Sequence, residues 1–167
     1  MKSKPVILAT CPIPTPLGSF AAHYSASGLA RLDFPGRKKT AHVSAASPAV
    51  LRWHKLACRA LARVLQGRAA GALPPLDLEG GTPFQKKVWA ALRQIPAGQT
   101  ESYGRLAAAL GAPKAARAVG GACGANPIPL LIPCHRVLPS GGGLGGFSGG
   151  LQWKRRLLAM EKWEDGG

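Results

Sequence analysis

Acidic residues are scarce in this chain: 7 Asp and Glu stand against 22 Lys and Arg among 167 residues. The formal net charge at pH 7 is therefore +15, which excludes an acidic disordered tail. A surface this basic is typical of proteins that bind polyanions, with nucleic acid the first candidate and an anionic membrane surface the second. The alternative is a soluble protein that its charge keeps dispersed.

Long apolar runs and cysteine patterns are also missing. The N-terminal apolar run, Val6–Ala9, is shorter than the core of a signal peptide, and no stretch approaches the roughly 20 residues of a membrane span. We therefore expect a cytoplasmic protein without a membrane partner, whose four cysteines are thiols. No C-x-x-C pair occurs and the histidines do not fall at zinc-site spacings, so we expect no metal site.

A Gly- and Pro-rich stretch, residues 67–81, divides the chain. We predict an N-terminal domain over residues 1–75, a linker over 76–81 and a second domain over 82–167. The predicted fold class is α/β, in the α+β sense. A small α/β domain with a short antiparallel sheet is followed by a mainly helical domain that contains a helix-turn-helix.

The first half predicts short strands over Val6–Thr10, Ser19–Ser25 and Leu29–Phe34, and then a helix from Pro48 to about Gln66. One face of this helix carries four basic residues at helical spacing. We interpret that face as a solvated surface. Its members are Arg52, Lys55, Arg59 and Arg63.

The second half predicts a helix that begins with the capping box Thr82–Gln85 and extends to Ile95. Two short helices follow, Tyr103–Leu110 and Lys114–Cys123, and together they predict the helix-turn-helix. The second is built mostly from Ala and Gly, with long side chains only at Lys114 and Arg117. Such a helix either packs tightly on its neighbour or approaches a nucleic-acid groove, and the overall charge favours the groove.

One cysteine differs from the other three, which we interpret as small buried apolar residues. Cys134 follows the apolar run Ile128–Ile132 and precedes His135, while Glu161 is the best-placed carboxylate for a third group. A thiol next to a base that a carboxylate orients is the arrangement of an activated nucleophile. Nearby positive charge, here available from His135 and Arg136, lowers the pKa of such a thiol. Chance adjacency of Cys and His remains the alternative on spacing alone.

The surrounding motifs resemble those of the O6-alkylguanine-DNA alkyltransferases, also called methylated-DNA–protein-cysteine methyltransferases. The resemblance is dense over residues 82–163 and weak in the first half. The matching motifs, in chain order, are Phe84-Gln85-x-x-Val88-Trp89, Ile95-Pro96-x-Gly98-x-Thr100-x-Ser102-Tyr103-Gly104, Arg117-Ala118-Val119-Gly120, Asn126-Pro127, Pro133-Cys134-His135-Arg136-Val137, Gly145-Gly146-Phe147-Ser148-Gly149-Gly150 and Lys154-x-x-Leu157-Leu158-x-x-Glu161.

The resemblance implies a DNA-repair enzyme that transfers an alkyl group, chiefly methyl, from the O6 atom of guanine to its own Cys134, once per molecule. It implies a monomer that needs no cofactor. The partner is double-stranded DNA containing O6-alkylguanine, bound at its minor groove with the damaged nucleotide flipped out of the helix.

The resemblance also implies residue roles. His135 would take the proton of Cys134 through a water, Glu161 would hold the imidazole, Tyr103 would protonate guanine, and Asn126 would tie the turn to the active-site segment. Arg117 would fill the gap left in the base stack. The remaining DNA-binding residues are Tyr103, Lys114, Ala115, Ala116, Ala118 and Gly120. The residues of the substrate pocket are Val137, Phe147, Ser148 and Gly149.

Two departures from the family pattern stand out. Ser25 occupies a position where zinc-binding members have a cysteine, and Phe147 stands where tyrosine is frequent. Two other functions were weighed. A non-catalytic relative that recognises alkylated guanine lacks the reactive cysteine. A helix-turn-helix transcription regulator needs base-reading side chains, whereas the second helix here is mostly Ala and Gly.

Overall fold

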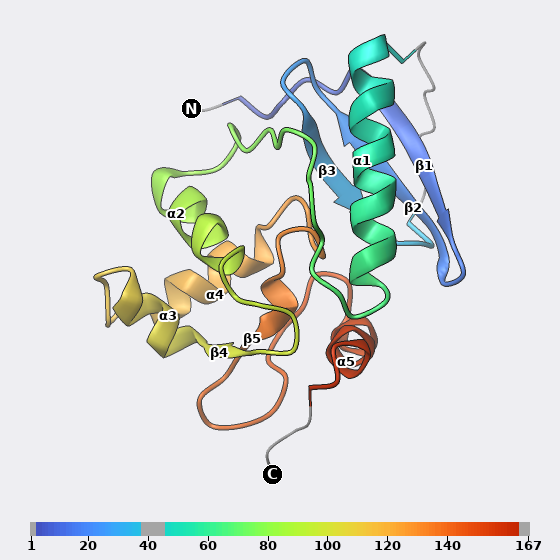
Figure 1. Ribbon diagram of the computed structural model, residues 1–167. Coiled ribbons are helices and arrows are strands. Elements are labelled where there is room, and N and C mark those ends of the chain that lie inside the picture. Colours follow the sequence, from blue (N-terminus) through green and yellow to red (C-terminus); the bar gives the residue numbers. More distant parts are fainter. Residues whose placement is uncertain (1–2, 38–45, 164–167) are drawn as a thin grey trace.

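A computed structural model of the protein describes residues 3–37 and 46–163. The first half is a three-stranded antiparallel sheet in the order β1-β2-β3, formed by Ala9–Thr15, Gly18–Tyr24 and Leu29–Asp33. Helix α1, Pro48–Val64, lies across one face of this sheet (Figure 1). Among the described residues, no helix is both long and apolar enough to span a membrane.

The first strand lies later in the chain than we predicted. β1 starts at Ala9 instead of Val6 and continues through Pro12 and Pro14 to Thr15, beyond the predicted end at Thr10. Proline lacks a backbone N–H, but β1 is an edge strand that pairs only with β2, so the missing donors are tolerated. The turn that follows needs Gly18, whose φ is +110° and whose Cβ would lie 2.7 Å from Pro35.

Helix α1 begins and ends close to its predicted bounds for local reasons. Ser47 accepts a hydrogen bond from the backbone N–H of Val50, and Pro48 occupies the first turn, where no N–H is needed. The buried positions Ala57, Leu61 and Val64 recur at helical spacing and face the sheet.

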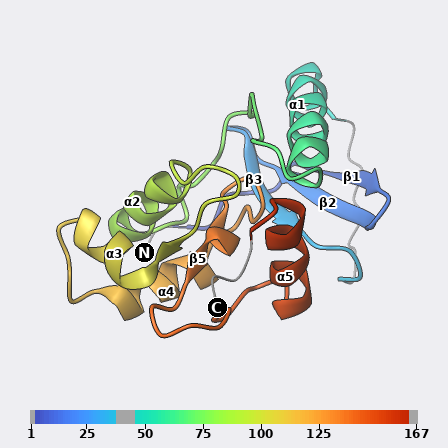
Figure 2. The same ribbon diagram turned by 60° about the horizontal axis from the view of Figure 1, so that its bottom comes forward.

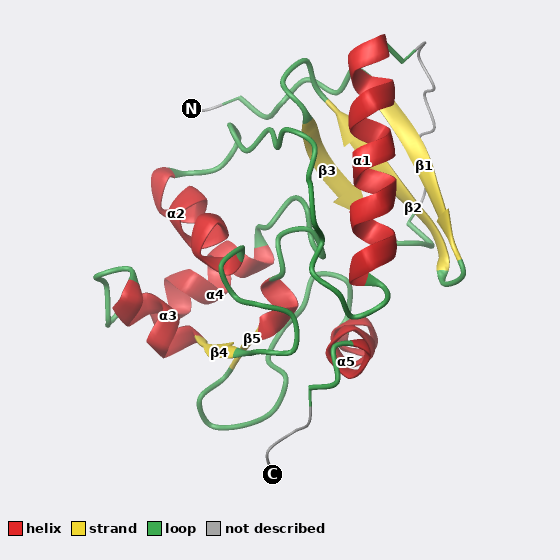
Figure 3. Ribbon diagram, in the orientation of Figure 1, coloured by secondary structure: helices red, strands yellow, loops and turns green. Residues whose placement is uncertain are grey.

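The second half contains four helices: α2 (Pro83–Leu92), α3 (Tyr103–Ala109), α4 (Ala116–Gly124) and α5 (Leu151–Met160). Figures 1 and 2 show α3 and α4 side by side at the end of the molecule away from α1, as a helix-turn-helix requires. Figure 3 shows how little strand this half contains. The predicted fold class is confirmed.

Three features of this half differ from the sequence prediction. Helix α2 ends at Leu92 instead of Ile95. Helix α4 begins at Ala116 instead of Lys114, and its N-cap, Ala115, makes no side-chain capping bond. A two-residue parallel ladder joins β4 (Glu101–Ser102) to β5 (Val137–Leu138), which we had not predicted. Strands of two residues are too short to show any periodicity.

The two halves share one hydrophobic core. Phe20 and Phe34 of the sheet side contact Trp153 of α5, with ring centroids 5.5 and 5.2 Å apart. The predicted linker is also tied down: Asp77 donates its backbone N–H to Leu29 at 2.8 Å. The boundaries that we drew between the domains stay a prediction.

Candidate active site

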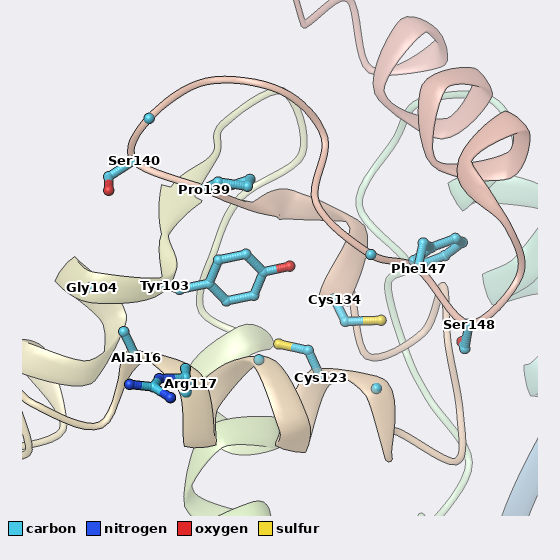
Figure 4. Close-up of a pocket in the computed structure, with 14 residues that line it drawn as sticks. Tyr103, Gly104, Ala116, Arg117, Cys123, Cys134, Pro139, Ser140, Phe147 and Ser148 are labelled. Atoms are coloured by element: carbon cyan, nitrogen blue, oxygen red, sulfur yellow. The ribbon is translucent and has the colours of Figure 1, made fainter.

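Cys134 lines a cavity of about 740 Å³ between the helix-turn-helix and the glycine-rich loop formed by residues 141–150 (Figure 4). The residue starts a one-turn 3-10 helix, Cys134–Arg136, and is only 3% exposed. Its backbone N–H donates to Ile132 at 2.8 Å, which turns the chain sharply at the end of the buried run. The thiol therefore lies at the inner wall of a cavity that opens beside α3 and α4.

The side chain of Asn126 holds this turn through two hydrogen bonds. Its Nδ2 donates to the carbonyl of Ile132 at 2.8 Å, and its Oδ1 accepts from the backbone N–H of Ile128 at 3.0 Å. Both bonds are buried, so losing either would leave unpaired polar groups inside the protein. The contacts agree with the expected link between the turn after α4 and the segment that carries Cys134.

The environment of Cys134 favours the neutral thiol. Burial raises the pKa of the thiol, while a hydrogen bond with Asn126 and the positive charge of Lys154 act in the opposite direction. The sequence had suggested that Arg136 lowers this pKa, and that expectation is wrong, because Glu161 and a backbone carbonyl bind its guanidinium. Cys134 consequently needs a base to remove its proton before it can attack.

The hydrogen bond between His135 and Glu161 orients the imidazole as a base for Cys134 requires. Its Nε2 lies 2.9 Å from Oε1 of Glu161, and a carboxylate only accepts, so Nε2 carries the proton and Nδ1 keeps its lone pair. Nδ1 is buried and has no hydrogen-bond partner among the described residues. Burial lowers the pKa of His135, which keeps the imidazole neutral at pH 7. The ring is thus oriented with a free acceptor.

Glu161 has three hydrogen-bond partners, His135, Arg136 and the backbone N–H of Gly98. Burial raises its pKa, but hydrogen bonds from His135 and Arg136 outweigh this effect and bring the pKa to about 2. The Nη2 and Nε atoms of Arg136 lie 2.7 and 3.1 Å from the two carboxylate oxygens. Its Nη1 donates to Ile95, and Gly98 donates its N–H to the carboxylate. The loop after α2 is thereby fixed to the catalytic segment.

Lys154 is a buried cation close to Cys134 for which sequence reasoning gave no role. The side chain is fully buried, and its Nζ donates to the carbonyls of Val137 at 2.8 Å and Gly146 at 3.2 Å. Burial lowers the pKa of this ammonium. A signal was present, because Lys154 falls on the same buried stripe of α5 as Leu157 and Leu158. A lysine on an apolar stripe needs internal acceptors.

Tyr103, the first residue of α3, extends its ring into the cavity toward Cys134 and Cys123 (Figure 4). Burial raises the pKa of the phenol to about 12, so the hydroxyl keeps its proton at pH 7. Cys123 lines the same cavity from α4, and burial raises its pKa to about 12 as well. The sequence had given Cys123 only a packing role and offered no sign of this position.

The predicted DNA-binding residues divide into two groups. Ala116, Arg117 and Gly120 line the cavity, and the exposed guanidinium of Arg117 points away from Cys134 at its outer side. Lys114 and Ala115 precede α4 instead of belonging to it. Ala118 is exposed and lies outside the cavity wall.

The predicted pocket residues divide similarly. Phe147 and Ser148 line the cavity, whereas Val137 and Gly149 lie outside its wall. Val137 is buried in β5, and its carbonyl already accepts from Lys154. A Cβ on Gly149 would lie 2.5 Å from the ring of Phe34, so glycine here permits close packing of the loop on the sheet.

The buried histidines predict how stability depends on pH. Burial lowers the pKa of His23, His54 and His135, so all three stay neutral in the folded protein at a pH where they charge in the unfolded chain. Stability is therefore retained above about pH 6.5 and falls below it, with each such group losing at most about 1.4 kcal/mol per pH unit. Urea unfolding at about pH 7.5 and 5.5 measures this loss. Equal stability at both would mean that none of the three histidines has a lowered pKa in the folded protein.

Comparisons with known proteins agree with this geometry. The family model described as 6-O-methylguanine DNA methyltransferase, DNA binding domain, matches residues 83–163. A methylated-DNA–protein-cysteine methyltransferase of Salmonella typhimurium is 61% identical over 96 residues, which cover 55% of this chain and 56% of the relative. The chain thus matches little more than half the length of that relative.

Other similarities extend over almost the whole chain. The methylated-DNA–protein-cysteine methyltransferase of Methanosarcina barkeri is 41% identical over 153 residues, or 90% of this chain and 94% of the relative. A crystal structure of Mycobacterium tuberculosis OGT in complex with DNA superposes with a TM-score of 0.78 and 39% identity, covering 93% of each chain. The resemblance inferred from the motifs is confirmed, and the chain belongs to the methylated-DNA–protein-cysteine methyltransferase family.

Proposed function

We propose that the protein repairs DNA by moving an alkyl group, chiefly methyl, from the O6 atom of guanine to Sγ of Cys134. The carbon–oxygen bond breaks and a carbon–sulfur bond forms, so guanine is restored and the protein is left with a thioether. Each molecule acts once, and no cofactor takes part. The observation that carries the proposal is a buried thiol in a cavity beside a base oriented by a carboxylate.

The proton of Cys134 passes to His135 in this mechanism. Because Glu161 binds Nε2, the lone pair of Nδ1 is the available base. One water between Sγ and Nδ1 completes the path, and the imidazolium that forms is stabilised by the Glu161 carboxylate. The positive charge of Lys154 favours the thiolate as it develops.

Tyr103 supplies a proton at the other end of the reaction. When the alkyl group passes to sulfur, guanine keeps the electron pair of the broken carbon–oxygen bond. Protonation at N3 prevents the departing base from becoming an anion. The phenol suits this role, since its raised pKa keeps it protonated until the guanine becomes basic. Phe147 and Ser148 would hold the base from the opposite loop.

The damaged nucleotide must leave the helix to reach Cys134, because the thiol lies at the inner wall of the cavity. We infer that α4 enters the minor groove, since its small residues allow close approach to the DNA. Arg117 at the outer side of the cavity then occupies the gap in the stack. We propose that the protein acts as a monomer on duplex DNA.

Transfer assays on two substrates test both parts of this proposal. Wild-type protein is expected to gain the mass of one methyl group in place of a hydrogen, both from methylated duplex and from free O6-methylguanine. Arg117→Ala is expected to slow transfer from saturating duplex strongly and from the free base much less, because a free base needs no flipping. Single-turnover intact-mass measurements give both rates.

Lys114→Ala is the matched control, since it removes an exposed cation just before the same helix. A phosphate contact there predicts a modest loss on DNA, recovered at lower salt or higher DNA concentration. Equal slowing of Arg117→Ala on both substrates would remove Arg117 from the flipping step. No mass gain by the wild type would refute alkyl transfer itself.

A further inference from the structure

The outer face of α1 is a continuous line of positive charge, which we call the α1 stripe. Its four residues are spaced by three or four along the helix, so they extend over about 16 Å on one side. All four are exposed, and they lie opposite the buried positions that face the sheet. The stripe consists of Arg52, Lys55, Arg59 and Arg63.

No described carboxylate neutralises the stripe. Helix α1 contains no acidic residue, and each described Asp or Glu has a partner elsewhere in the fold. Asp33 pairs with His23 and Arg31, Asp77 with Ser25, Glu79 with Lys86, Glu101 with Arg105, and Glu161 with His135 and Arg136. Arg63 donates its Nε–H to the carbonyl of Ala69 at 2.8 Å, and this neutral acceptor does not cancel its charge. The positive charge therefore faces solvent.

Such a stripe lowers the stability of the helix that carries it. Like charges at spacings of four destabilise a helix by a few tenths of a kcal/mol each. A surface that serves only solubility avoids this cost by mixing charges of both signs. This cost is the reason to consider a function for the face beyond the solvated surface that we predicted.

The stripe is also remote from the helix-turn-helix. In both Figure 1 and Figure 2, α1 lies at the opposite side of the molecule from α3. One straight, short duplex seated on α4 would leave the stripe unoccupied. Duplex DNA presents about one negative charge per 1.7 Å of its axis, which matches an extended line of cations.

We propose that the α1 stripe is a second DNA-binding surface, which holds the phosphate backbone of another duplex segment while α4 occupies the first. The contact is independent of base sequence, because four exposed cations reach phosphates but no base edge. It lets one protein molecule bridge two segments of DNA. The inference rests on the proposed binding of DNA through α4 but not on alkyl transfer.

Lysine acylation with a short undamaged duplex tests the two surfaces separately. Acylation of Lys55 reports whether DNA covers the stripe, and acylation of Lys114 reports whether it covers the helix-turn-helix. The exposed Lys87 of α2 is the reference. With excess duplex we expect several-fold protection of Lys55 and Lys114 but none of Lys87.

Protection of Lys114 alone would overturn the proposed DNA contact of the stripe and leave the proposed function standing. Protection of Lys55 alone would support the stripe and count against binding through α4. Equal protection of all three lysines, or of none, would overturn the stripe.

A capture assay tests bridging. Protein bound to an immobilised duplex should retain a second, labelled duplex, and the triple change Arg52→Gln, Lys55→Gln, Arg59→Gln should reduce this capture at least tenfold. The slope of log affinity against log salt for the second duplex should become shallower by about 2 to 3, as expected for three lost phosphate contacts. Transfer from a short methylated duplex should not change.

The matched control removes the same charge elsewhere through Lys87→Gln, Arg93→Gln and Arg155→Gln, three exposed cations outside the stripe. It should capture the second duplex as the wild type does. Equal loss in both triple variants would reduce the effect to net charge and overturn the proposal. Retention of anionic phosphatidylserine vesicles but not of a second duplex by the wild type would replace DNA with a membrane as the partner.

Discussion

Cys134→Ser is expected to show no detectable gain of mass after incubation with methylated duplex. An alcohol is a far weaker nucleophile than a thiol at neutral pH, and a neutral base such as His135 removes its proton much less readily. Binding to undamaged duplex should be nearly unchanged, because phosphate contacts lie elsewhere. Intact-mass spectrometry and a binding titration on the same sample measure the two effects.

Cys58→Ser is the control, since Cys58 lies on α1 and outside the cavity. It should transfer the methyl group like the wild type. Cys123 shares the cavity with Cys134 and is the alternative acceptor. Retained transfer by Cys134→Ser together with lost transfer by Cys123→Ser would move the acceptor to Cys123.

Glu161→Gln is expected to lower the free energy of unfolding by about 3 kcal/mol, since it leaves the buried guanidinium of Arg136 without a counter-charge. Transfer should fall sharply as well, because a glutamine amide no longer fixes the proton on Nε2 of His135. Urea unfolding gives the first effect and single-turnover transfer the second. Glu79→Gln is the matched control: its bond to Lys86 is exposed, so the loss should stay below about 1 kcal/mol.

The pH dependence provides an independent check on Glu161. Its pKa of about 2 in the folded protein lies below its ordinary value of 4.5, so the carboxylate stabilises the fold fully above pH 4.5. That stabilisation is lost as the pH falls from 4.5 toward 2. The Glu161→Gln variant should lose less stability than the wild type over this window. Parallel curves would mean that Glu161 is not ionised in the folded protein.

Local signals made much of the fold predictable. Ser47, Thr82 and Ser102 each cap a helix that the sequence predicted, and such starts are predictable because a capping bond involves only neighbouring residues. The start of α4 was missed because Ala115 offers no such side chain. The ladder between β4 and β5 joins segments more than thirty residues apart, so its formation depends on tertiary packing.

The candidate site, like the fold, was only partly predictable from the sequence. Motif spacing and family resemblance brought together Cys134, His135 and Glu161, and the contact between the last two has the expected form. The partners of Arg136 and Lys154 were not foreseeable, because which carbonyls a buried cation reaches depends on the folded chain. Burial also reversed the expected direction for the thiol pKa, since desolvation outweighs nearby charge.

The prolines of β1 bear on how the protein behaves at high concentration. An open sheet edge invites strands of other molecules to pair with it, which begins aggregation. Pro12 and Pro14 are exposed on this edge and remove two of the donors that such pairing requires. A protein that the proposed reaction consumes has to be present in numbers that match the lesions. An edge that resists self-association allows many copies to accumulate without precipitating.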